Sequence, residues 1–162
     1  MDSLNELIEL YIGHNTSLSH SGLEIVRDFD PEMPKIFPDI HHFERDALTS
    51  DIMHMIIELS GEQADAKMFY DGSMTKLRYG TVFVSGIQYL VMDHDGKQIP
   101  ADTLAKLNRT LSAIGAGKRI NTMGRGGNYR AAWHLVDYGG RISMENRSSE
   151  YSVCTTVGIP LQ

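Results

Sequence analysis

The chain has 162 residues, of which 41% are hydrophobic and 22% charged, and its formal net charge is -6. This length suits one domain with a core of its own, and the composition is ordinary for a globular protein. The negative charge argues against a general nucleic-acid binder, which needs a basic surface to neutralise phosphates. We therefore expect no nucleic-acid partner.

Cysteine usage and the first residues indicate the compartment. The single cysteine, Cys154, cannot form an internal disulfide, which favours a reducing, cytoplasmic location. The opening residues include Asp2, Glu6 and Glu9 and lack the basic start and apolar core of a signal peptide. No apolar run is long enough for a membrane span, so we expect no direct membrane contact by this chain.

The first half of the chain predicts a helix, a strand, a loop and a second helix. A capping box and apolar residues at helical intervals predict a helix over about residues 3 to 17. Residues 23 to 29 alternate as a half-buried strand does, and the three prolines in residues 30 to 39 predict a loop. Thr49 or Ser50 can cap the next helix.

The middle of the chain predicts strands and another helix. Apolar runs at residues 67 to 70, 77 to 84 and 88 to 92 are separated by short polar turns, which is typical of antiparallel strands. Asp102 or Thr103 can then cap a helix with leucines at helical intervals.

The last third predicts a loop, a helix and two strands. Residues 113 to 127 are rich in glycine and have no periodic apolar pattern, which predicts a long mobile loop. Apolar residues from Tyr129 to Val136 follow helical spacing, and two strand-like runs end at Pro160. The element order predicts an α+β fold, with a mixed, mostly antiparallel sheet covered on one face by about three helices.

A glycine-rich turn at Gly124, Gly126 and Gly127 precedes the last predicted helix. Such turns suit phosphates, because backbone N–H groups can approach an anion closely and the helix N-terminus carries partial positive charge. By itself the pattern more often marks an ordinary loop.

Four stretches, taken in order, resemble the ATP-binding catalytic domain of sensor histidine kinases. That domain belongs to a wider superfamily with DNA gyrase, heat-shock chaperones and mismatch-repair ATPases. The matching stretches are LNELIELYIGHNTSLSHSGLEIVRDFDPEMPKIFPD, the N-box-like HMIIELSGEQADA, the adenine-turn-like LVMDHDGKQIPADTL and the closing GGRISMENRSSEYSVCTTVGIPL. Together they cover most of the chain.

The resemblance implies a Bergerat-type two-layer α/β sandwich that forms a single domain over residues 1–162, with residues 113–127 as an ATP lid. It implies ATP and Mg²⁺ as ligands. Lys118, Arg119 and Arg125 would lie where the triphosphate charge arrives, and the glycines of the turn would form the lid hinge. A solvated basic loop is the alternative for the three cations.

The N-box-like stretch departs from the family pattern. Glu62 takes the place of the magnesium-binding Asn, and Glu58 takes the place where superfamily ATPases have a general base. Carboxylates can ligate Mg²⁺, but they repel a triphosphate when the metal is absent. With His54 one turn earlier they form a stripe on one helix face that can hold a metal or can be a solvated surface.

The adenine-turn-like stretch also departs from the family pattern. Alignment on Ile99–Pro100 puts His94 in place of the Asp that accepts a hydrogen bond from adenine, with Gly96 in the turn. A one-residue insertion would instead make Asp93 the ligand. The sequence leaves both registers open.

Three functions remain open. The first is a histidine-kinase ATP-binding module that passes the γ-phosphoryl group to a histidine on a separate dimerisation domain or phosphotransfer partner, upstream of a response regulator. The second is a degenerate domain with weak or no ATP binding that regulates or docks in two-component signalling. The third is an anti-sigma-type serine kinase.

Overall fold

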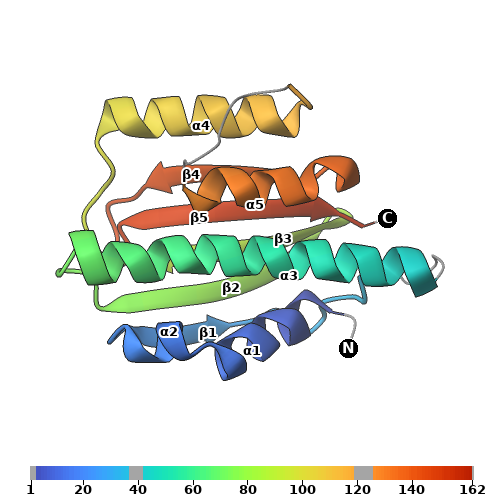
Figure 1. Ribbon diagram of the computed structural model, residues 1–162, viewed down its shortest axis with the longest axis horizontal. Helices are drawn as coiled ribbons and strands as arrows, with labels where there is room; N and C mark the ends of the chain where they lie inside the picture. Colours follow the sequence, from blue (N-terminus) through green and yellow to red (C-terminus); the bar gives the residue numbers. More distant parts are fainter. Residues whose placement is uncertain (1–2, 37–41, 119–125, 162) are drawn as a thin grey trace.

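A computed structural model describes residues 3–36, 42–118 and 126–161. One five-stranded sheet, in the order β1-β2-β3-β5-β4, forms one layer, and helices cover one of its faces (Figure 1). Helix α3 crosses the middle of that face, with α1 beside it over β1 and α5 over β4 and β5. Among the described residues no helix is both long and apolar enough to span a bilayer.

The sheet is mixed and mostly antiparallel, which confirms the predicted fold class. Only β1 and β2 pair in parallel, and β2, β3, β5 and β4 follow as antiparallel neighbours. The strands are β1 (Glu24–Asp28), β2 (Lys76–Val84), β3 (Ile87–His94), β4 (Arg141–Asn146) and β5 (Val153–Pro160). A tight turn with positive φ at Ser85 and Gly86 joins β2 to β3, because such turns match the strand twist.

The α-helices are α1 (Leu4–His14), α2 (Thr16–His20), α3 (His42–Asp65), α4 (Ala101–Gly115) and α5 (Gly127–Leu135). The Ser3 hydroxyl caps α1 by accepting a hydrogen bond from the Glu6 amide, as predicted. Asn15 then caps α2 in the same way through the Leu18 amide. The predicted first helix is therefore two helices, because Asn15 ends one and begins the next.

Two helix starts differ from the prediction. Helix α3 begins at His42, before both Thr49 and Ser50, because residues 43–48 contain neither glycine nor proline to stop it. Helix α4 begins after Pro100, which is its N-cap, and no side chain caps it. Its last turn reaches Gly115, so the first part of the predicted 113–127 loop is helical.

The predicted strand at residues 67 to 70 is wrong. Residues Ala66–Tyr70 form a π-helical turn that continues α3. Met68, Phe69 and Tyr70 are all exposed there, so this apolar run packs into no sheet. Without alternation of buried and exposed positions, a four-residue apolar run does not distinguish a strand from the end of a helix.

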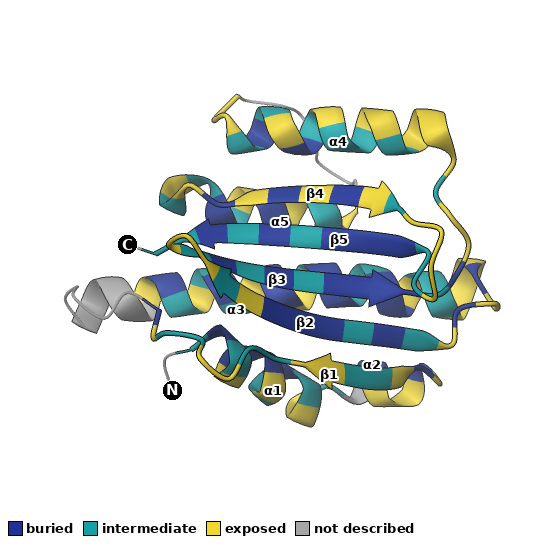
Figure 2. Ribbon diagram, turned by 180° about the vertical axis from the view of Figure 1, so that it is seen from behind, coloured by how far each residue is buried: buried dark blue, intermediate teal, exposed yellow. Residues whose placement is uncertain are grey.

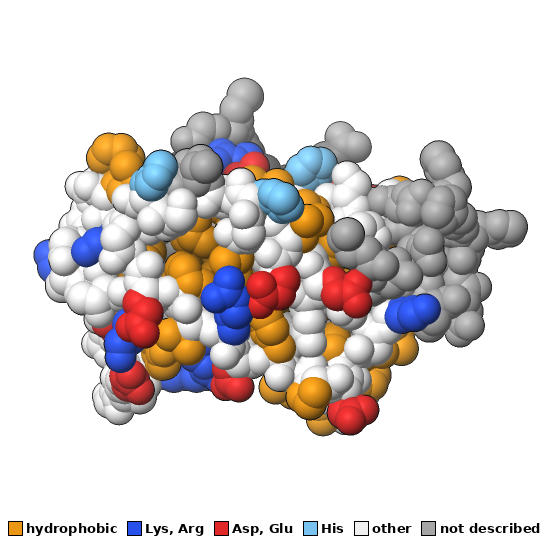
Figure 3. Space-filling view, turned by 90° about the horizontal axis from the view of Figure 1, so that it is seen from below, with side chains coloured by type: hydrophobic (Ala, Val, Ile, Leu, Met, Phe, Trp, Pro, Cys, Tyr) orange, Lys and Arg blue, Asp and Glu red, His pale blue; other side chains and the backbone are white. Residues whose placement is uncertain are grey.

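The core lies between the helices and the covered face of the sheet. Burial alternates along the strands, since every second side chain points at the helices (Figure 2). On the side seen in Figure 3, acidic and basic side chains of the described residues lie interspersed among hydrophobic ones. An ion pair between Arg27 and Glu9, at 2.6 Å, joins β1 to α1.

A buried polar contact ties α3 to the sheet. The Tyr79 hydroxyl of β2 lies 2.7 Å from the Ser60 hydroxyl of α3, and both residues are fully buried. Burial raises the pKa of Tyr79, so the phenol stays protonated and can donate this bond.

We predict that Tyr79→Phe lowers the free energy of unfolding by about 1–2 kcal/mol, because the change removes a buried hydrogen bond without opening a large cavity. Urea unfolding of the wild type, Tyr79→Phe, Ser60→Ala and the double variant measures this. The two single effects should add to more than the double effect, and strict additivity would contradict the contact.

Candidate functional site

A cavity of about 420 Å³ lies where the end of α3 meets the segment between β3 and α4. This volume is within the range of small-molecule sites in proteins, about 300–1,000 Å³. Its lining combines acidic, basic, amide and apolar side chains. The lining residues are Glu62, Gln63, Ala66, Tyr70, Asp71, Met74, His94, Lys97, Gln98, Ile99, Pro100, Asn128 and Met144.

His94 reaches this cavity from the end of β3. It falls in the same alternation as the buried Leu90 and Met92, so its side chain points toward the helix layer. Its Nδ1 accepts a hydrogen bond from the Gly96 amide at 3.1 Å. Burial lowers the pKa of His94, against the opposing effect of nearby carboxylates, of which Asp71 has the largest effect. The imidazole is therefore neutral at pH 7.

Asp71 is a cavity residue that the sequence analysis missed. It is nearly fully buried, and its carboxylate accepts hydrogen bonds from the Lys97 amide at 2.7 Å and the Ser73 amide at 3.0 Å. A side chain at Gly96 would collide with this carboxylate, so Gly96 is what lets Asp71 close over the turn. Asp71–Gly72–Ser73 reads in sequence as a turn, and nothing in it indicates contact with residues more than twenty positions later.

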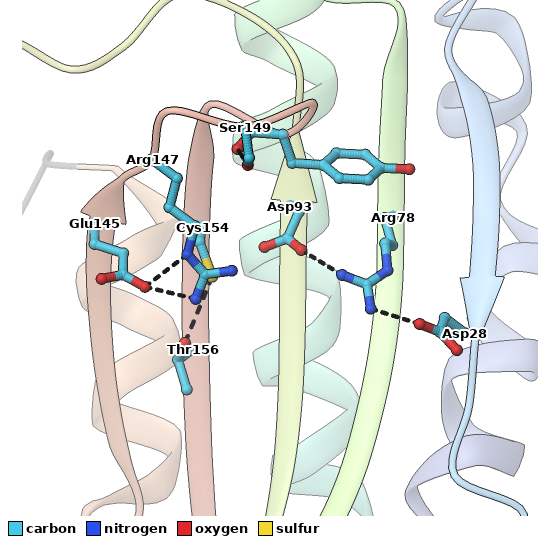
Figure 4. Close-up of polar contacts among 9 residues, drawn as sticks. Asp28, Arg78, Asp93, Glu145, Arg147, Ser149, Cys154 and Thr156 are labelled. Carbon is cyan, nitrogen blue, oxygen red and sulfur yellow. Dashed lines mark hydrogen bonds and ion pairs between the residues drawn. The ribbon is translucent and has the colours of Figure 1, made fainter.

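Asp93, the other candidate adenine ligand, lies on the opposite face of the sheet. It alternates with His94, and its carboxylate pairs with Arg78 at 2.7 Å, which in turn pairs with Asp28 (Figure 4). Asp93 is not among the residues that line the cavity. Of the two registers left open by the sequence, the structure places only His94 at the cavity.

Glu62 belongs to α3, and its side chain lies at the N-terminus of α5. Its Oε1 accepts a hydrogen bond from the Gly127 amide, the first residue of the helix, and its carboxylate fills the space beside Gly126. The first amides of a helix are its positive end, so a carboxylate there is stabilised. Gly126 and Gly127 therefore face a carboxylate of the chain itself.

The three residues of the predicted stripe, His54, Glu58 and Glu62, have separate partners on α5. Glu58 Oε2 pairs with Arg130 Nε of α5 at 2.9 Å, and the His54 ring stacks on His134 of α5 at 5.2 Å between centroids. All three side chains contact α5, each at a different place. The stripe is thus the α3 side of a helix–helix contact.

The remaining predicted cofactor residues lie elsewhere or are not described. Lys118 is exposed just after α4 and is not among the cavity residues. Arg119, Gly124 and Arg125 lie outside the described residues. Among the residues that line the cavity, the basic side chain is Lys97.

Comparison with solved structures identifies the fold. The catalytic domain of the histidine kinase ThkA is 17% identical over 98% of this chain and 92% of that one, with a TM-score of 0.63. The mycobacterial sensor histidine kinase MprB is 11% identical over 98% and 94%, also with a TM-score of 0.63. The histidine kinase AdeS of Acinetobacter baumannii is 15% identical over 99% and 66%, with a TM-score of 0.62.

These likenesses show that the chain has the fold of histidine-kinase catalytic domains, as the sequence motifs predicted. Neither a protein-family model nor a curated protein matches the chain. The residues at the cavity must therefore be judged by their own chemistry.

The residues present do not fit a metal-free triphosphate. Glu62 and Asp71 bring carboxylates to the cavity, and His94 is held neutral. The amide at the start of α5, which would suit a phosphate, already donates to Glu62. An anion here would have to displace a carboxylate or share the site with it.

The lowered pKa of His94 predicts a pH effect on stability. In the unfolded chain the imidazole titrates near its ordinary pKa of about 6.5, so below that pH the unfolded state binds a proton that the folded state excludes. Neutral His94 therefore makes its full contribution to the free energy of unfolding above about pH 6.5. This contribution falls by up to about 1.4 kcal/mol per pH unit as the pH drops toward the pKa that His94 has in the folded chain.

We therefore expect the wild type to lose more stability than His94→Gln between pH 7 and pH 5. Urea unfolding of both proteins at pH 8, 7, 6 and 5 measures the difference, with pH 8 as the common baseline. Parallel curves for the two proteins would show that the imidazole is not excluded from protonation.

The approach of α5 to α3 predicts a second effect. A Cβ at Gly127 would collide with the main-chain carbonyl of Glu58, whereas a Cβ at Gly61 on the same helix α3 meets nothing. We expect Gly127→Ala to destabilise the fold by about 1–3 kcal/mol and Gly61→Ala to stabilise it by up to about 1 kcal/mol. Thermal and urea unfolding measure both, and similar effects for the two would refute the close approach.

Proposed function

We propose that this chain is a histidine-kinase-like module of two-component signalling whose ATP binding is weak or lost, and that it works as a regulatory or protein-interaction module. The observation that carries the proposal is the Glu62 carboxylate on the Gly127 amide at the start of α5. A second departure, His94 at the cavity with Asp93 turned away, supports it.

Electrostatic repulsion between the carboxylates at the cavity and a triphosphate supports the proposal. Two like unit charges about 4 Å apart repel by about 4 kcal/mol at an effective dielectric constant of 20. That energy weakens binding by roughly a thousandfold. A triphosphate carries several negative charges, and Lys97, the basic residue of the cavity lining, has to offset both Glu62 and Asp71. Binding of ATP without a metal is therefore strongly disfavoured.

The proposed partners are those of two-component signalling. They are a histidine-containing dimerisation domain or phosphotransfer partner, and a response regulator. Support comes from the solved complex of the histidine kinase ThkA with the response regulator TrrA, whose kinase is 19% identical over 99% of this chain with a TM-score of 0.67. This chain spans 41% of that kinase chain.

A second function, Mg-ATP binding with phosphoryl transfer, has two observations in its favour. The cavity is large enough for a ligand, and Asn128, which lines it, has a buried Oδ1 without a hydrogen-bond partner among the described residues. In this alternative Glu62 would hold Mg²⁺ in place of its contact with α5, and Glu58 would be the general base. Its cofactors would be ATP and Mg²⁺.

Calorimetric titration with ATP, with and without Mg²⁺, tests the proposal. We expect the wild type to bind with a Kd of about 1 mM or weaker in both conditions. Glu62→Asn, which removes the charge from the start of α5, should bind Mg-ATP at least tenfold more tightly. Asp65→Asn removes one charge from an exposed position of the same helix and should bind as the wild type does.

The alternative predicts the opposite pattern. If Glu62 holds the metal, the wild type binds Mg-ATP well below 1 mM, and Glu62→Gln loses that binding. This pair of results would overturn the proposal.

A further inference from the structure

A cluster of metal-binding side chains lies on the α3–α5 contact, away from the cavity. Asp51 and His54 lie three positions apart on one face of α3, and His134 lies near the end of α5. One ligand atom from each of the three falls within 4.8 Å of the others. None of the three lines the cavity described above.

We propose that Asp51, His54 and His134 form a site for a divalent transition-metal ion of the zinc type, which clamps α5 to α3. Two imidazole nitrogens and one carboxylate oxygen are the ligands that zinc and its neighbours in the series take. Magnesium prefers an all-oxygen shell with bound water, so this set selects against it.

The geometry requires only a small adjustment. Ligands about 2.0–2.2 Å from a tetrahedral zinc lie roughly 3.3–3.6 Å from one another. Asp51 Oδ1 is already 3.7 Å from His134 Nδ1. The three side chains are half-buried or exposed, so rotations about their side-chain bonds can close the remaining gap, and the metal can enter from solvent.

A neighbouring hydrogen bond orients Asp51, as is common for carboxylates that bind metals. The Tyr138 hydroxyl donates a hydrogen bond to Asp51 Oδ2 at 2.7 Å, which orients the carboxylate and leaves Oδ1 for a metal. The rings of His54 and His134 lie 5.2 Å apart at 29°, so the two imidazoles already lie side by side. Three protein ligands leave a fourth position for water.

The two helices that the metal would join also form the contact at Glu58, Glu62 and Gly127. A metal bound only to the folded chain must stabilise it by mass action. The inferred site therefore fixes α5 against α3 and does not depend on whether ATP binds.

Zinc titration of the whole chain tests the inference. We expect one Zn²⁺ to bind with micromolar or tighter affinity by calorimetry, and saturating Zn²⁺ to raise Tm. His54→Ala and His134→Ala should each weaken the affinity at least tenfold and remove the rise in Tm, whereas Mg²⁺ should give no rise. Co²⁺ in place of Zn²⁺ should give a visible absorption band of a nitrogen and oxygen site, which His134→Ala abolishes.

Two controls separate this site from other histidines. His20→Ala removes an exposed histidine of α2, and the double variant His41→Ala/His42→Ala removes a histidine pair whose side chains are not described. Both should bind Zn²⁺ as the wild type does. Loss of binding in either control, full binding in His134→Ala, or no binding by the wild type would each overturn the inference.

Discussion

The contact between the start of α5 and the second half of α3 is the constraint on which the site depends. Gly127 approaches the Glu58 carbonyl so closely that only glycine fits, and this brings the first amide of α5 within reach of Glu62. A helix N-terminus needs hydrogen-bond acceptors, and here a side chain of the neighbouring helix supplies one. A carboxylate of the protein itself thus occupies the position where an anion would bind.

The alternation of the strands decides the other half of the site. Because neighbouring residues of β3 point to opposite faces, a shift of one residue exchanges Asp93 and His94 completely. Arg78 holds Asp93 on the uncovered face, in an ion pair where Asp93 is almost fully buried and Arg78 is partly exposed. To turn Asp93 toward the cavity would leave Arg78 without this partner and would put His94 outside the core.

Local patterns predicted most of the fold: alternation marked β1, helical spacing marked α5, and apolar runs bounded by turns marked β2, β3 and the last two strands. These patterns failed at residues 67 to 70, where a short apolar run ends in exposed side chains, and at the start of α3, which begins before both predicted caps. The residues of the site were harder to predict than the fold. His94 and Glu62 were found because motifs fixed their positions. Asp71 joins the cavity through contacts with Gly96 and Lys97, which lie more than twenty residues later and which no local pattern records.

The two departures from the family pattern, Glu62 and His94, have the same physical effect. A carboxylate at the first turn of a helix stabilises it by about 0.3–1 kcal/mol, and a neutral buried histidine avoids the larger cost of a buried, unpaired charge. Glu62 and His94 therefore favour the folded chain without a ligand, whereas an Asn and an Asp at these positions would leave polar groups to be satisfied by one. Residues that bind ligands commonly reduce stability, and their replacement commonly restores it. The cavity of this chain is accordingly stable without a ligand, which agrees with the proposed regulatory or protein-interaction role.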